Sequence, residues 1–159
     1  MGGAIRRQPL ARPYGPDRSM GDRAAAPVMK RPLLAGLTIL IAWMLLDLLI
    51  HRTFLAPIYE ATKNLWRPFD QMNVVLIYTT TIVLIGVFVG MYTWLVRPKS
   101  LAAGFGLGAF VGLALGISVG LGTFIHMPIP SSVAWGWFVG GWLKGLVAGA
   151  IVGTVIVES

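Results

Sequence analysis

Glycine recurs at every fourth position in two neighbouring apolar segments of the chain. Each glycine weakens a helix by about 1 kcal/mol relative to alanine, so long glycine rows indicate that two backbones must come into close contact. In lipid, rows of small residues allow helices to approach and pack in this way. The sequence therefore predicts a membrane-embedded helical hairpin whose two arms touch along these rows. The rows are Gly104, Gly108, Gly112, Gly116 and Gly120 in one segment, and Gly141, Gly145, Gly149 and Gly153 in the next.

The composition agrees with a membrane protein. Of the 159 residues, 56% are hydrophobic and only 12% are charged, whereas a soluble domain is about one quarter charged. The mean hydropathy is +0.75, and the apolar residues lie in long runs. The chain has no cysteine, which excludes disulfides, thiolate metal sites and thiol chemistry.

Four apolar stretches are each near the length of about twenty residues that is needed to cross the hydrocarbon core. They cover roughly 33–50, 74–96, 101–125 and 133–157. Backbone polar groups in lipid must be satisfied within each segment, so all four are expected to be helices. The predicted fold class is all-α, a polytopic membrane protein with four transmembrane helices. The third and fourth would form a glycine-zipper hairpin, because only the short sequence MPIPSS joins them.

The chain divides into a tail at 1–28 and a four-helix domain at 29–159. The tail is rich in glycine, proline, arginine and alanine without apolar periodicity, so we expect it to be disordered. Alternatively, synthesis begins at Met29. The tail is basic, but Tyr14 is its only aromatic residue. Because single-stranded nucleic acids are bound by aromatic side chains within basic grooves, we expect anionic lipid headgroups and no nucleic acid as its partners.

Charge in the connecting segments predicts the orientation. Lysine and arginine are enriched on the cytoplasmic side of membrane proteins. An orientation with both termini inside places the basic tail, Arg97 and Lys99 in the cytoplasm. Only Arg52, Lys63 and Arg67 then lie outside. We therefore expect an N-in, C-in protein of a prokaryotic cytoplasmic membrane.

The connection between the first two spans has its own pattern. Apolar residues recur at roughly helical spacing over 53–67, with charged residues between them. Pro57 suits the first turn of a helix, and Pro68 would end it. The pattern favours an amphipathic helix on the outer membrane face over an irregular loop.

A few ionisable residues fall within or beside the predicted spans: Asp47, His51, His126 and Lys144. Lys144 lies near the middle of the fourth span, where a charge costs on the order of 2.5–3.5 kcal/mol and usually has a partner. We predict an Asp47–Lys144 ion pair with His51 and His126 above it. The cluster has three interpretations: a structural ion pair, a proton- or ion-handling site, or a metal site formed by Asp47, His51 and His126.

Several short motifs resemble those of a group of small prokaryotic four-helix integral membrane proteins. They are LLDLLIHRTFLAP at 45–57, LWRP at 65–68 and WLVRP at 94–98. The resemblance implies the topology alone and brings no activity to any residue.

These features predict a non-catalytic accessory or scaffold subunit of a larger membrane complex, because no catalytic constellation is visible. Its partners would be membrane lipids and other membrane subunits, or further copies of the chain. We expect no cofactor and no metal. The alternative is a small proton or ion transporter or channel component that uses the four ionisable residues.

Overall fold

The computed structural model describes residues 19–158 of the chain, and the side chains of residues 29–158. Its described residues form helices and connecting turns without a strand. Four helices are long and apolar enough to cross a membrane: Met29–Phe54, Val74–Leu95, Leu101–His126 and Ser131–Val155. The predicted all-α class is therefore confirmed, and four of its helices have the length and apolar composition predicted for membrane spans.

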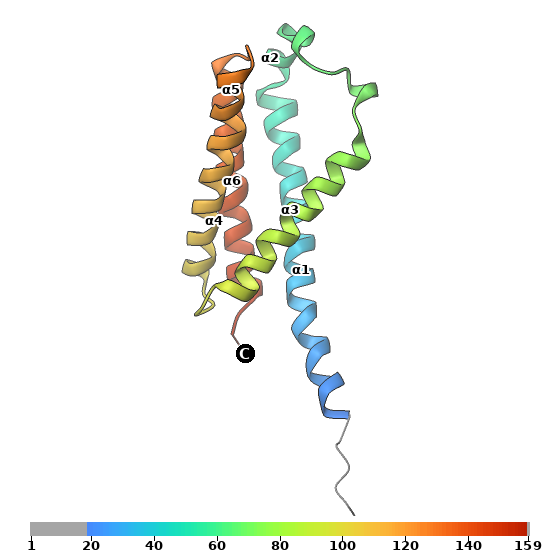
Figure 1. Ribbon diagram of the computed structural model, residues 1–159, viewed down its shortest axis with the longest axis vertical. Helices are drawn as coiled ribbons and strands as arrows, with labels where there is room; N and C mark the ends of the chain where they lie inside the picture. Colours follow the sequence, from blue (N-terminus) through green and yellow to red (C-terminus); the bar gives the residue numbers. More distant parts are fainter. Residues whose placement is uncertain (1–18, 159) are drawn as a thin grey trace, which may run out of the picture.

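The order of the helical elements is shown in Figure 1. Two of the spans contain a π-helical turn, η1 and η4, within an otherwise α-helical rod. The elements are α1 Ser19–Leu49, η1 Ile50–Phe54, α2 Ala56–Ala61, η2 Lys63–Leu65, η3 Phe69–Gln71, α3 Val74–Leu95, α4 Leu101–Gly116, η4 Ile117–Leu121, α5 Gly122–His126 and α6 Ser131–Val155.

The first helix begins earlier than the sequence predicts. Residues 19–28 belong to α1 rather than to a disordered tail. The three alanines at 24–26 offer a physical reason, because alanine has the highest helix propensity of all residues. Residues 1–18 of the predicted tail lie outside the described part of the chain.

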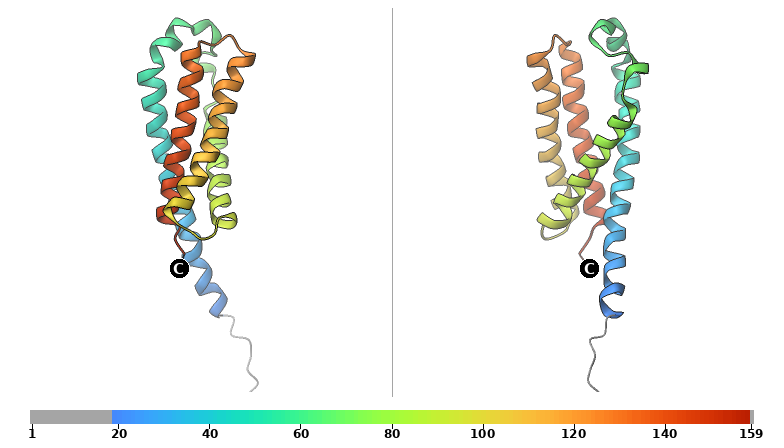
Figure 2. Two further views of the ribbon diagram at one scale, coloured as in Figure 1. Left: turned by 90° about the vertical axis from the view of Figure 1, so that its left-hand side faces the viewer. Right: turned by 45° about the vertical axis from the view of Figure 1, so that its right-hand side comes forward.

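Helices α4 and α6 run side by side in both views (Figures 1 and 2). The glycines of both rows lie where the two helices meet, and all are buried except the half-buried Gly141. A Cβ atom placed on Gly112 would lie 2.8 Å from the carbonyl oxygen of Trp142. One placed on Gly149 would lie 3.0 Å from the Cα of Gly108. No side chain larger than hydrogen fits at these positions without moving a backbone.

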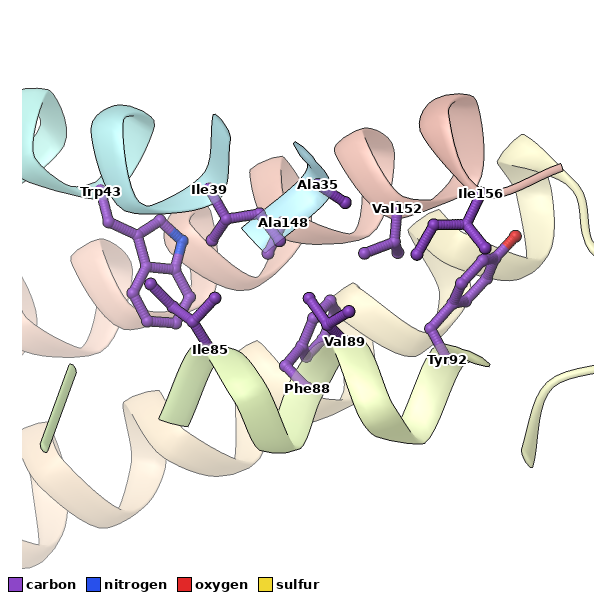
Figure 3. Packing of buried hydrophobic residues seen from close by; sticks show 10 residues of the cluster. All are labelled: Ala35, Ile39, Trp43, Ile85, Phe88, Val89, Tyr92, Ala148, Val152 and Ile156. Atoms are coloured by element: carbon purple, nitrogen blue, oxygen red, sulfur yellow. The ribbon is translucent and has the colours of Figure 1, made fainter. Parts of the chain in front are cut away.

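The main hydrophobic core joins α1, α3 and α6 in the half of the bundle near the C-terminus (Figure 3). α3 contributes only residues from its C-terminal half to this core. Its N-terminal half diverges from α4 and α6 (Figures 1 and 2). The core consists of Ala35, Ile39 and Trp43 from α1, Ile85, Phe88, Val89 and Tyr92 from α3, and Ala148, Val152 and Ile156 from and after α6.

The turn between α3 and α4 is fixed by side-chain contacts to both helix ends. Lys99 Nζ donates to the carbonyl oxygens of Tyr92 at 2.7 Å and of Thr93 and Val96 at 2.9 Å. A cation is favoured here because the last carbonyls of a helix lack backbone donors. Ser100 caps α4, since its hydroxyl accepts from the amide of Ala103 at 3.0 Å.

We call residues 53–67 the outer segment, after the side of the membrane predicted for them. The segment differs from the single amphipathic helix predicted there. It consists of the end of η1, the short α2 and the short η2, with Pro57 in the first turn of α2. Leu55 is only 4% exposed. It packs against Gly136 of α6. Ile58 and Trp66 pack on a second buried cluster formed by Ile129, Val133 and Ala134. The segment is broken because it folds over the end of α6 instead of lying straight along the membrane surface.

Candidate functional site

The contact between α1 and α6 brings Asp47 and Lys144 together. Lys144 Nζ lies 2.5 Å from Asp47 Oδ1. His51 follows Asp47 by four residues on the same side of the helix, and its Nε2 lies 3.7 Å from the same oxygen. The ion pair predicted from the sequence is present, with His51 beside it.

Trp43 contacts both the backbone and the ammonium group of Lys144. Its indole Nε1 donates to the backbone carbonyl of Lys144 at 3.0 Å. Its ring also lies under the ammonium, with 5.4 Å between Nζ and the ring centroid. A cation over an indole face is stabilised by the ring quadrupole. Trp43 precedes Asp47 by four residues, so helical spacing alone could have included it in the predicted cluster.

The polar contacts extend from His51 to the outer segment through Tyr59. Trp137 Nε1 donates to the Tyr59 hydroxyl at 2.6 Å. His51 Nδ1 lies 2.8 Å from the same hydroxyl. An indole can only donate, so Tyr59 accepts from Trp137 and can donate its own proton to His51 Nδ1. The other imidazole nitrogen, Nε2, then holds the ring proton and faces Asp47.

Aromatic rings surround Tyr59 and reduce its contact with water. The rings of His51 and Tyr59 are stacked with centroids 5.9 Å apart. The rings of Tyr59 and Trp66 form a T-shaped pair with 5.2 Å between centroids. Burial raises the pKa of the Tyr59 hydroxyl above its ordinary value of 10.0, and the hydrogen bond from Trp137 opposes this rise. Tyr59 and Trp137 were not predicted, because their contact depends on how the outer segment folds onto α6.

His126 does not join the other three ionisable residues. It ends α5, is exposed, and is not among the residues that line the cavity beside Lys144. The prediction that His126 belongs to the cluster depends only on the depth of His126 in the membrane. Depth does not fix the direction in which a helix presents a side chain, and here α5 directs it elsewhere.

A cavity of about 300 Å³ lies beside the Asp47–Lys144 pair. Its polar lining comes from α1, η1 and α6, which supply Asp47, His51 and Lys144. The walls contributed by α3 and by α4 with η4 are apolar. They consist of Leu84, Val87, Phe88, Met91, Val111, Leu115 and Val119. The arrangement can form hydrogen bonds with a polar group while surrounding an apolar one.

A metal site of Asp47, His51 and His126 does not fit this geometry. Among the side chains described, those of residues 29–158, no group of three or more histidines, aspartates or glutamates is placed to hold a metal ion. No protein-family model matches the chain, and no curated protein or solved structure is significantly similar to it. Its function therefore has to be inferred from the geometry of its own surfaces and side chains.

Proposed function

We propose that this protein is a non-catalytic subunit of a membrane assembly and that α3 provides the contact surface. One observation carries the proposal: every residue from Val74 to Leu84 is exposed except Thr81, which is half-buried. These residues form the first half of a membrane span. Because the other helices cover so little of this half of α3, most of its surface is available to a partner.

The hydroxyl groups on this half of α3 support a protein partner over lipid alone. Thr80 and Thr81 donate to carbonyl oxygens of their own helix, at 2.9 Å for the bonds to Leu76 and Ile77. The structure gives the exposed Thr79 hydroxyl no hydrogen bond to any described residue. Threonine hydroxyls in membrane helices commonly bond across to a neighbouring helix.

We infer that the α4–α6 pair is a glycine-zipper hairpin that forms the rigid part of the subunit. Its support is the absence of space for a Cβ atom along both rows. Four membrane crossings would place the start of the first span and the end of the fourth on the same side of the membrane. The excess of lysine and arginine in the tail and the α3–α4 turn favours N-in and C-in placement in a prokaryotic cytoplasmic membrane.

Extraction in a mild detergent followed by native gel electrophoresis tests the proposal. The wild-type protein should migrate in a larger assembly of fixed stoichiometry. The Val75→Trp variant should dissociate, because Val75 is 77% exposed on the proposed contact half of α3. Phe110→Trp is the matched control, since Phe110 on α4 is also 77% exposed. Migration of the wild type as a monomer would contradict the proposal.

A proton or ion transporter is the second proposal, and the contacts of Tyr59, His51, Asp47 and Lys144 favour it. They form a polar path from the outer segment to the middle of α6. Purified protein in liposomes would then conduct protons or cations, and Asp47→Asn and Lys144→Ala would reduce the flux. Unchanged flux in both variants would eliminate transport.

A further inference from the structure

We propose that the cavity beside Asp47 and Lys144 binds a single-chain, uncharged amphiphile with a hydroxyl head group. The volume of about 300 Å³ is at the lower end of the usual range for small-molecule sites, about 300–1,000 Å³. The proposal rests on the cavity and its polar wall, and it does not require a protein partner at the Val74–Leu84 half of α3.

The ion pair leaves hydrogen-bonding capacity that faces the cavity. An ammonium group has three donors, and the structure pairs Lys144 Nζ with one carboxylate oxygen, Asp47 Oδ1. The contact from His51 falls on the same oxygen. The contacts that Lys144 and His51 make with the Asp47 carboxylate both fall on Oδ1, so Oδ2 is the oxygen offered to a ligand in the cavity. Both side chains remain accessible, at 22% for Lys144 and 41% for Asp47.

Within a membrane span, lipid tails offer these free positions no hydrogen-bond partner. A head group that enters the cavity must accept a hydrogen bond from Lys144 and donate one to Asp47 Oδ2. A hydroxyl does both, because it has one donor and two acceptor lone pairs. An ester or ether oxygen can only accept.

The charges that line the cavity disfavour an anionic head group. Lys144 and Asp47 cancel, and the Tyr59 hydroxyl allows His51 to be a neutral imidazole. A carboxylate head group would add a second negative charge next to Asp47. Like charges at such a site are disfavoured in an apolar environment.

The remaining walls suit a hydrocarbon chain. The lining residues of α1 and η1 extend from Trp43 to His51, a helix length of roughly 12 Å at 1.5 Å per residue. The opposite walls from α3 and α4 are aliphatic, together with Phe88. Where the N-terminal half of α3 diverges from the bundle (Figure 2), an amphiphile can enter from the lipid phase.

Binding is tested by native mass spectrometry of the full chain in an amine-oxide detergent, which has no hydroxyl group to compete. The probes are 1-monolauroylglycerol, methyl laurate and laurate, which share one chain and differ in the head group. We expect one bound monolauroylglycerol per chain, with about tenfold weaker binding of the other two, because each loses a hydrogen bond or adds a charge.

Two further comparisons locate the site. Val87→Trp fills the apolar wall and should abolish binding, whereas Val83→Trp, on the same helix but outside the cavity lining, should not. The double variant Asp47→Leu with Lys144→Leu should bind methyl laurate and monolauroylglycerol equally. Equal binding of these two probes by the wild type would overturn the proposal. So would equal effects of the two tryptophan substitutions.

Discussion

Replacement of Gly108 by alanine tests the glycine contact between α4 and α6. A Cβ atom on Gly108 would meet the carbonyl oxygen of Gly145 and lie 2.9 Å from the Cα of Gly149. Both neighbours are backbone atoms, so neither can rotate away as a flexible side chain would. The helices must separate, and the contacts of adjacent glycines are lost with them.

The size of the effect follows from two opposing terms. Overpacking a well-packed contact costs about 1–3 kcal/mol. Alanine favours the helix by about 1 kcal/mol relative to glycine. Because the clash is with backbone, we take the upper part of the first range and expect Gly108→Ala to lower the free energy of unfolding by about 1–2 kcal/mol.

Gly106 provides the matched control two residues away on the same helix. A Cβ atom at this position meets nothing within 4 Å. Gly106→Ala should therefore raise the free energy of unfolding by up to about 1 kcal/mol through helix propensity alone. Both variants are measured by circular dichroism during reversible unfolding in mixed micelles with increasing dodecyl sulfate. Shifts of the same sign and size in the two variants would refute the reasoning.

Three further predictions concern the polar groups. Lys144→Met should destabilise the protein by up to about 2.5–3.5 kcal/mol, since it leaves Asp47 unpaired in the span. The double variant Asp47→Leu with Lys144→Leu should recover most of this loss in the same unfolding assay. No recovery in the double variant would contradict this prediction. Tyr59→Phe should cost about 1 kcal/mol, because Trp137 Nε1 loses its acceptor, and an unchanged unfolding midpoint would count against this contact. The raised pKa of Tyr59 means that the folded state favours the protonated hydroxyl. The contribution of this hydroxyl to the free energy of unfolding is complete below pH 10 and is lost as the pH rises through the folded-state pKa. Unfolding between about pH 8 and pH 11 should therefore show an alkaline loss of stability that is smaller in Tyr59→Phe than in the wild type, and identical pH profiles would contradict this.

Hydrophobic runs and glycine spacing were sufficient to predict the four spans. Each run is close to the length of about twenty residues needed to cross the hydrocarbon, and that requirement does not depend on tertiary contacts. The Asp47–Lys144 pair was also predictable, because a charge in the middle of a span needs a partner and few were available. Glycine content alone does not identify the positions of contact between the helices. Gly106 lies in the same segment as the row at 104–120, but a Cβ atom at this position would face open space.

The parts that were not predicted depend on packing between distant segments. His126 was placed by depth alone, and its direction is set by how α5 continues from the π-helical turn η4. Tyr59 and Trp137 meet only because the outer segment folds over the end of α6. The divergence of α3 has no local sequence signal, because its apolar residues are distributed around the whole helix.

Site-specific photo-crosslinking in native membranes tests the assembly proposal most directly. A diazirine amino acid is introduced at Val75 of α3 or, in a separate variant, at Phe110 of α4, positions of equal 77% exposure. If α3 is the contact surface, irradiation should give a discrete protein adduct from position 75 and lipid adducts alone from position 110. Lipid adducts alone from both positions would contradict the account.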